Sequence, residues 1–422
     1  MMEHFKLKNL VYPADSKVIV TAFCSDLSLL ENIEAGYISG NGCHQNGTMP
    51  ESLRQFEPIS FKVCGNILEF ELYLAGEGLH SIKLQYEKDT VLEYGYLEFY
   101  SLYEDLFKLT PFKGNFHCHT IESDGLNTPQ NTLCVARAAG FDFIGFSEHR
   151  LYSNHIEDCQ TLLDMLGVKL FHAEEVHSVP KWVSHILSFG ADECVSVRQE
   201  TSQYQTDVEN ALSNYPELSE ELRNYAAQSE VILRYISEAG GLGVMCHPYW
   251  KHAGRYNVPF KLADTFFAKL PFEAVELATS DNANTSLVNA KYCEIIRTGA
   301  DLPVIAGNDW HGKNGERMEQ AYNIIFAESC DEKIIADAIR ERRCAAVYGE
   351  EDPMVFGDFR MVNYALFLLR NYYGQRDALC EQLGILSLCV LNGNTSFDCE
   401  ISRLKAAVDL QDMMLKNISV SI

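Results

Sequence analysis

Two histidines and a carboxylate at close spacing form the first group of residues that could do chemistry. The run 116–125 reads FHCHTIESDG, in which His117 and His119 are two positions apart and Asp124 precedes a glycine. Side chains two residues apart in an extended strand point to the same side, so the histidines can present two imidazoles to one ion. Asp124 can bend back to the same point if the chain turns at Gly125. The run therefore predicts part of a metal site.

Residues of the same kinds recur at the end of nearly every apolar segment that follows. They are Glu148 and His149, then Glu174, Glu175 and His177, then His185, His247 and Glu276, and finally Asp309 and His311. Buried carboxylates and imidazoles need compensating partners, and a shared cation suits this mixture of oxygen and nitrogen donors. Seven strand ends of this kind favour one metal centre over seven separate structural roles.

Four residues beside these candidates keep two interpretations. Glu276 would orient a ligand or the substrate, or line the barrel as a structural acid. Glu174 is expected to be an acid behind the ligands or a solvated one, because its neighbour Glu175 points to the opposite face. Cys118 and Cys246 are expected to pack in the core, with thiolate ligation as the alternative.

Alternating strand and helix patterns must position these residues. Thr128 and Pro129 form a predicted helix start, Gly140 a predicted helix end, and the apolar run 141–146 follows as a buried strand. The same order of patterns recurs as far as Tyr348, which predicts an α/β fold with a parallel sheet closed into a barrel. Catalytic groups should lie at the carboxyl ends of its strands. The polar insertion at 200–230 is a lid over the barrel mouth or a solvated excursion.

The two ends of the chain have different patterns. Short alternating segments such as 17–23, 67–74 and 80–86, separated by turn residues, predict a β-sandwich-like accessory domain at 1–110. The barrel is expected at 111–357. Two amphipathic helical patterns, at 362–373 and 401–415, predict a helical C-terminal extension at 358–422, which packs on the barrel or pairs subunits into a homo-oligomer. Both alternatives stay open.

Composition and charge limit the partners. The chain of 422 residues carries 34 Lys and Arg against 59 Asp and Glu, a net charge of −25. Such a surface repels a phosphate backbone, so nucleic acid is not expected as a partner. The start contains no secretion signal and no segment is apolar enough to span a bilayer. We therefore expect a cytoplasmic protein with reduced cysteines and no membrane partner.

The motifs, taken in order, carry a family resemblance. HCHT..SDG, SEH, AEEVHS, HILSFG, CHP and GNDWH resemble the successive motifs of the polymerase and histidinol phosphatase (PHP) superfamily, over roughly 114–349. The resemblance implies a distorted seven-stranded (β/α)7 barrel, two or three divalent metal ions (Mn, Fe or Zn) and phosphoesterase activity. The N-terminal β-domain followed by KGNFH is also similar to the carbaryl hydrolase branch, whose namesake cleaves a carbamate.

The resemblance also implies three ion positions around one carboxylate. The ligands would be His117, His119 and Asp309 at the first position, His185 and His247 at the second, and His149 and His311, with Asp124, at the third. Glu175 would bridge the first two positions. Strand parity agrees, because Glu175 and His177 would share one face, as would Asp309 and His311.

Two positions depart from the family motifs. Glu148 stands where an aspartate is usual, and Asn308 replaces a serine. A longer carboxylate at 148 can still hydrogen-bond or ligate, so its role stays open. The leaving group needs a proton, and His177, Glu148 and His252 are the candidates to assist it. With the bridging Glu175, His177 and Glu148 form the predicted catalytic set.

A basic and aromatic run after the CHP motif is suited to a phosphate. Residues 249–255 read YWKHAGR, and Arg255 is the first candidate to clamp the phosphate. Further substrate-binding candidates are Lys251, His252 and Arg150, with Lys181 behind them; alternatively, these cations only offset the acidic surface. We therefore expect a hydrolase acting on a small phosphorylated molecule through a hydroxide shared by two ions. The alternatives are a carbamate, ester or amide hydrolase and a non-catalytic metal-binding module.

Overall fold

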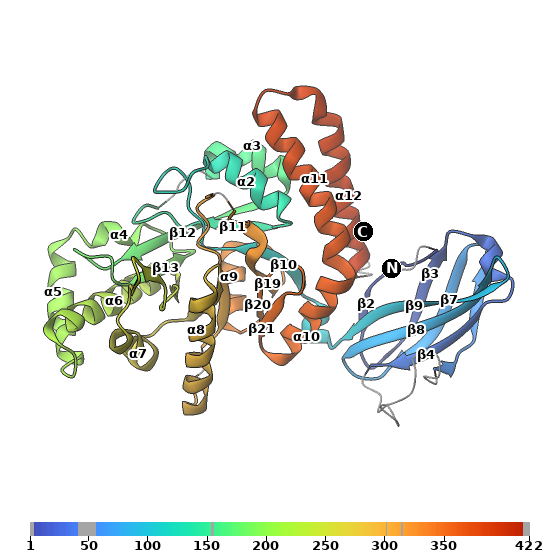
Figure 1. The fold of residues 1–422 in the computed structure, drawn as a ribbon, viewed down its shortest axis with the longest axis horizontal. Coiled ribbons are helices and arrows are strands. Elements are labelled where there is room, and N and C mark those ends of the chain that lie inside the picture. Colours follow the sequence, from blue (N-terminus) through green and yellow to red (C-terminus); the bar gives the residue numbers. More distant parts are fainter. Residues whose placement is uncertain (1–3, 41–55, 153–155, 301, 314, 417–422) are drawn as a thin grey trace. The chain divides into compact units, whose positions relative to one another are not determined.

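The computed structural model describes residues 4–40, 56–152, 156–300, 302–313 and 315–416 (Figure 1). The chain divides into two compact units. The first consists of Met1–Leu109, Asn363–Arg376 and Ala406–Ile422, and the second of Thr110–Val362 and Asp377–Lys405. The segment 358–422, expected as one helical extension, therefore contributes residues to both units.

The first unit contains two β-sheets. One has the strand order β1 (Phe5–Leu7), β3 (Ser16–Cys24), β7 (Ile67–Leu74) and β6 (Phe61–Cys64); the other has β2 (Val11–Pro13), β9 (Val91–Leu102), β8 (Gly78–Lys88), β4 (Glu34–Ser39) and β5 (Glu57–Pro58). Alternate residues of both sheets, such as Val20, Phe70, Leu84 and Phe99, meet in one core. The short helix α1 (Glu104–Phe107) follows β9.

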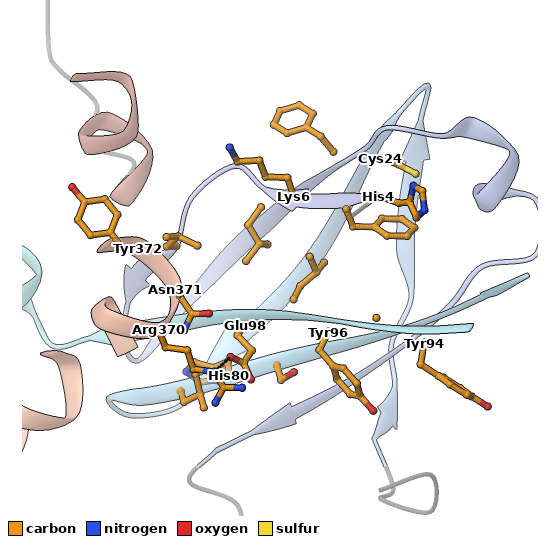
Figure 2. Close-up of a pocket in the computed structure, with 18 of the residues that line it drawn as sticks. His4, Lys6, Cys24, His80, Tyr94, Tyr96, Glu98, Arg370, Asn371 and Tyr372 are labelled. Atoms are coloured by element: carbon orange, nitrogen blue, oxygen red, sulfur yellow. Dashed lines mark ion pairs between the residues drawn. The ribbon is translucent and has the colours of Figure 1, made fainter. Parts of the chain in front are cut away.

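A groove of about 1450 Å³ lies in the first unit, and Figure 2 shows the side chains that line it. His80 borders the groove but is itself completely buried. Its ring nitrogens form hydrogen bonds with the Tyr37 hydroxyl (2.6 Å) and the Ser101 hydroxyl (2.7 Å), and its ring stacks on Phe99. Burial lowers the pKa of His80 to about 4.

This buried histidine makes stability depend on pH. A histidine whose pKa is lower in the folded chain binds fewer protons there, so its contribution is complete above about pH 6.5 and is lost as the pH falls towards 4. Between pH 7.5 and 5.5 the loss should reach about 1 kcal/mol. Denaturant unfolding followed by circular dichroism should show a smaller pH dependence for His80→Gln than for the wild type. Equal pH dependence of both proteins would contradict this prediction.

The second unit is built on one ten-stranded sheet. Its strand order is β18 (Val304–Gly307), β17 (Ala274–Thr279), β14 (Leu242–Met245), β13 (His185–Phe189), β12 (Lys169–His177), β11 (Phe143–Phe146), β10 (Thr110–Asn115), β19 (Ala321–Ala327), β20 (Cys344–Tyr348) and β21 (Met354–Gly357). The sheet is mixed, whereas we expected seven parallel strands. Strands β12 and β13 pair antiparallel because the connection 178–184 is too short for the crossover that a parallel pair needs.

Buried Asn323 on β19 brings the sheet close to closure. Its side-chain amide accepts from the Ala306 N–H (2.8 Å) and donates to the Ala306 carbonyl (2.8 Å). These two bonds join β18 to β19 in place of backbone hydrogen bonds between the strands. Small side chains allow this approach, and four alanines form a cluster there: Ala278, Ala306, Ala321 and Ala346. The unit is therefore a mixed α/β fold with a nearly closed, barrel-like sheet, as expected in outline.

Helices lie between many of these strands and after the last one. They are α2 (Pro129–Ala138), α3 (Ile156–Leu166), α4 (Val195–Arg198), α5 (Ser202–Ala211), α6 (Glu220–Glu238), α7 (Phe260–Lys269), α8 (Asn282–Ile295), α9 (Glu332–Arg340), α10 (Phe359–Leu368), α11 (Gly374–Leu391) and α12 (Asp398–Leu415). Helix α2 begins as predicted, with the Thr128 hydroxyl accepting from the Asn131 N–H and Pro129 at its first position. None of the helices in the described residues is long and apolar enough to cross a membrane.

The segment 200–230 packs its apolar side chains into a hydrophobic core of the second unit. Helix α5 and the start of α6 occupy it, and Tyr204, Val208 and Tyr225 are buried in the same core cluster as Val176 of β12. A mobile lid would have to expose these side chains each time it opened. The lid hypothesis therefore finds no support in this packing.

Candidate metal centre

Two isolated backbone bridges bring the candidate ligands together. Cys118 pairs with Trp310, with hydrogen bonds from the His119 N–H to the Trp310 carbonyl (2.8 Å) and from the Trp310 N–H to the His117 carbonyl (3.3 Å). This bridge places His117 and His119 beside Asp309 and His311. A second bridge joins His149 to Glu175. The predicted strand geometry at Asp309 is wrong, because β18 ends at Gly307 and Asp309 has a left-handed φ of 50°.

Four donor atoms converge at the first predicted ion position. His117 Nε2 lies 3.2 Å from Asp309 Oδ1 and 3.4 Å from Glu175 Oε2. His119 Nε2 lies 3.0 and 3.4 Å from the same two oxygens. Two imidazoles and two carboxylates thus face one point.

The other oxygen of Glu175 faces the second predicted position. Glu175 Oε1 lies 2.6 Å from His185 Nδ1 and 3.2 Å from His247 Nε2. At the third position, Asp124 Oδ1 lies 3.3 Å from His149 Nε2 and 3.2 Å from His311 Nε2. The structure therefore brings all the predicted ligands together, and Glu175 belongs to three of the clusters that they form.

The donor set fits divalent cations. Glu175 is fully buried, and its ion-pair partners among the described residues are all histidines. Burial opposes its ionisation, but His185 and His117 lower its pKa well below the ordinary value, and His117 does the same for Asp309. Among the described residues, Glu175 Oε2 and His117 Nε2 make no hydrogen bond of suitable angle, although His149 Nδ1 lies 2.8 Å from Glu175 Oε2. Ionised buried carboxylates beside unpaired imidazole nitrogens form a typical site for Mn, Fe or Zn.

Glu276 on β17 orients one ligand. Its Oε1 lies 2.6 Å from His117 Nδ1, and its Oε2 accepts from the His247 N–H (3.1 Å). His117 Nε2 is thereby directed towards Glu175. Gly307 leaves the space for this carboxylate, since a Cβ at that position would collide with it. Of the two interpretations left open by the sequence, the structure favours the orienting one.

The pair of Glu276 and His117 should tune metal affinity. We expect Glu276→Gln to weaken zinc binding about 10- to 100-fold, because the neutral amide no longer makes the imidazole more basic. Competition with a chromogenic chelator measures the affinity. Glu273→Gln is the matched control, since Glu273 pairs with Arg340 and not with a candidate ligand. An unchanged affinity in Glu276→Gln would show that the contact does not act on the metal.

Glu148 and Glu174, which precede candidate ligands in the sequence, accept hydrogen bonds from nearby N–H and hydroxyl groups. Glu148 accepts from the Thr120 N–H (2.9 Å) and hydroxyl (2.6 Å) and from the Ser123 hydroxyl, so it fixes the loop that leads to Asp124. Glu174 is buried and accepts from the N–H groups that begin α4, at Val195 (2.8 Å) and at the next residue. Glu174 is therefore not solvated, and neither acid belongs to a ligand cluster of the described residues.

His177 and Cys246 lie beside the ligands. His177 is buried between the rings of His185 (4.2 Å) and Trp182 (4.4 Å), and neither of its nitrogens has a hydrogen-bond partner among the described residues. Its Nε2 lies 3.8 Å from Glu175 Oε2. Cys246 belongs to a cluster with His117, but burial and Glu276 raise its pKa well above the ordinary value.

The substrate-binding candidates lie on an exposed hairpin and in a core. Strands β15 (Lys251–His252) and β16 (Arg255–Tyr256) form the hairpin, where Lys251 packs over the Tyr256 ring at 4.7 Å. Arg150 instead interacts electrostatically with Tyr204 of the α5 core. Lys181 pairs with Glu221 on the surface (3.0 Å). Among the described side-chain contacts of these cations, none reaches the ligand clusters, although the Arg150 backbone N–H donates to the Glu175 carbonyl (3.0 Å).

Two tryptophans of the site, Trp182 and Trp310, were not predicted from the sequence, whereas Trp250 was noted in the aromatic run 249–255. The chain has three, and each stands within three positions of a candidate ligand: Trp182 before His185, Trp250 after His247, and Trp310 between Asp309 and His311. The Trp182 ring lies 5.7 Å from that of His149, and the Trp250 ring lies 5.8 Å from that of His247. The signal available in the sequence was this proximity of a rare residue to each ligand motif.

Comparisons with known proteins give structural neighbours only. No family model and no curated protein matches the chain. It is 19% identical to a two-domain protein from Bacteroides vulgatus containing a predicted PHP-like metal-dependent phosphoesterase, over 62% of this chain and 71% of that one, with a TM-score of 0.40. The chain is 18% identical to a candidate metal-dependent phosphoesterase from Bifidobacterium adolescentis, over 49% of this chain and 91% of that one, with a TM-score of 0.35.

A third neighbour is an amidohydrolase from Chromobacterium violaceum with bound sulfate and no metal, at 16% identity over 49% of this chain and 89% of that chain, with a TM-score of 0.34. All three neighbours are less than 20% identical to this chain. Their TM-scores are below 0.5, so we base the function on the residues of this chain.

Proposed function

We propose that the chain is a metal-dependent phosphoesterase that hydrolyses a small-molecule phosphate ester. The observation that supports it best is the buried Glu175, whose two oxygens face separate histidine clusters. Two or three divalent cations (Mn, Fe or Zn) would be held by the clustered ligands. Such cations activate water as a nucleophile and offset negative charge on a phosphoryl oxygen.

The residues around the ligands divide the remaining tasks. Glu276 holds His117 in position, and Glu148 holds the loop of Asp124, which makes Glu148 a positioning residue in this proposal. His177 remains the candidate to assist the leaving group, because its buried nitrogens are unpaired and one lies 3.8 Å from Glu175. His252 is the alternative on the hairpin.

The choice of a phosphate rests on the hairpin 251–256. It begins directly after Trp250, whose ring contacts that of His247, and it carries the exposed cations Arg255 and Lys251. With a net charge of −25, the chain would otherwise repel an anionic substrate. The same charge favours a small molecule over nucleic acid.

Replacement of Arg255 tests the phosphate clamp. We expect Arg255→Ala to raise KM for a phosphate monoester about tenfold, and to change KM for an uncharged ester far less, because a guanidinium binds the phosphate dianion strongly. Steady-state kinetics on both substrates measure the effect. Lys108→Ala, which removes an exposed cation that is not a substrate-binding candidate, is the control. Equal effects of Arg255→Ala on both substrates would refute the clamp.

Glu175→Gln tests the proposed function itself. The metal-loaded wild type should hydrolyse phosphate monoesters, lose activity with a chelator and regain it with Mn or Zn. We expect the variant to lose bound metal and at least about 1000-fold in kcat/KM, since removing one buried charge disrupts the whole ligand set. The exposed Glu221→Gln is the control.

A substrate panel decides between the proposal and its alternatives. Phosphate monoesters, carbamates, amides and carboxylic esters should be tested with the same metal-loaded protein. If only the uncharged substrates are hydrolysed, the chain is a carbamate, ester or amide hydrolase and not a phosphoesterase. Bound metal without turnover of any of them would favour a non-catalytic metal-binding module.

A further inference from the structure

An exposed indole lies directly against the ligand histidines. Trp182 is 51% exposed, although its ring packs at 4.4 Å on His177 and at 5.7 Å on His149. Trp250 packs on the other cluster, at 5.8 Å from His247 and 6.2 Å from His185. Both indoles therefore adjoin the histidines around Glu175, and a large apolar surface of Trp182 remains open to solvent.

One residue fixes the two tryptophan segments to each other. The Asn257 N–H donates to the Trp250 carbonyl (2.9 Å), and the Asn257 side-chain amide donates to the carbonyls of Trp182 (2.9 Å) and Val183 (3.3 Å). The backbone segments that carry the two indoles are thus tied together before any ligand arrives. Anchored segments lose less conformational freedom on binding than free loops do, which favours a ligand site here.

The hairpin adds positive charge to this aromatic surface. Arg255 and Lys251 follow Trp250 on β15 and β16, and both are exposed. A ligand that satisfies the site therefore combines an anionic group with a flat apolar one. A saturated alkyl group would gain only from burial, whereas a planar ring also gains from stacking on an indole.

We infer that the substrate of this site carries a planar aromatic ring in its leaving group, which packs on Trp182 and Trp250 while the ester lies at the metal ligands. The inference rests on the proposed function, because it assigns the substrate class of the same hydrolytic site. It makes the two indoles specificity determinants of the reaction.

Binding of two matched anions tests this inference without turnover. Naphthylmethyl phosphonate and cyclohexylmethyl phosphonate carry the same charged group and differ in the flat ring. Isothermal titration calorimetry with the zinc-loaded full chain should give a Kd about tenfold lower for the naphthyl ligand. Equal Kd values for the two ligands in the wild type would overturn the inference, and this comparison needs no variant.

Variants of Trp182 test whether this residue causes the preference for the naphthyl ligand. Trp182→Ala should remove most of the tenfold difference, and Trp182→Phe should keep part of it, because a phenyl ring still stacks. Phe359→Ala removes an 81% exposed aromatic residue outside the site and should leave both Kd values unchanged. Equal weakening of both ligands by Trp182→Ala would assign Trp182 a general structural role and contradict the inference.

Hydrolysis of the corresponding phosphates separates this inference from the proposed function. Turnover of both phosphates with equal KM would uphold the phosphoesterase and refute the aromatic preference. Selective binding of the naphthyl phosphonate without turnover of either phosphate would refute the phosphoesterase and keep the aromatic anion site. A lower KM for naphthylmethyl phosphate than for cyclohexylmethyl phosphate, with the difference lost in Trp182→Ala, is the expected result.

Discussion

The burial of the Glu175 carboxylate is the constraint on which the rest of the site depends. Transfer of an isolated carboxylate from water into a protein interior costs several kcal/mol or more, so it persists only with compensating positive charge. Its partners in the described residues are six histidines: His117, His119, His149, His177, His185 and His247. Protonated imidazoles can supply that charge in the metal-free site, and a shared divalent cation can supply it while the imidazoles act as neutral ligands.

The fold holds these donors in place with backbone interactions. The bridges from Cys118 to Trp310 and from His149 to Glu175 join segments that the sheet alone leaves unpaired. Asn323 draws β18 towards β19, so that Asp309 and His311 lie across from the loop after β10. Glu276 then sets the orientation of His117. Each of these contacts shapes the ligand set without touching the ion position itself.

Much of the ligand set could be predicted from the sequence because nearly every ligand follows an apolar run, and the ends of neighbouring strands meet. His185 instead begins β13, which runs antiparallel to β12 and β14. The roles of Glu148, Glu174 and Glu276 could not be predicted, since spacing does not encode whether a carboxylate turns to the site or to a nearby N–H group. The left-handed Asp309 broke the strand parity that we assumed. The position of Asp309 among the ligands was still predicted, because that prediction rested on the GNDWH motif and not on strand alternation.

The topology was predicted in outline and differed in its details. Regular βα patterns suggested a parallel sheet, but the short connection 178–184 forces β12 and β13 to pair antiparallel. Helix α11 was missed, although Cys380 and Leu383 on it are buried, because apolar residues occur all round it and give no amphipathic stripe. Long-range contacts decide such features, and local patterns do not record them.

Anomalous diffraction from zinc-loaded crystals, measured on both sides of the zinc absorption edge, tests most directly whether Glu175 lies between two metal ions. We expect anomalous peaks at the points where Glu175 faces His117, His119 and Asp309, and where it faces His185 and His247. Well-ordered crystals with full zinc in the solution and no anomalous peak beside Glu175 would contradict this expectation.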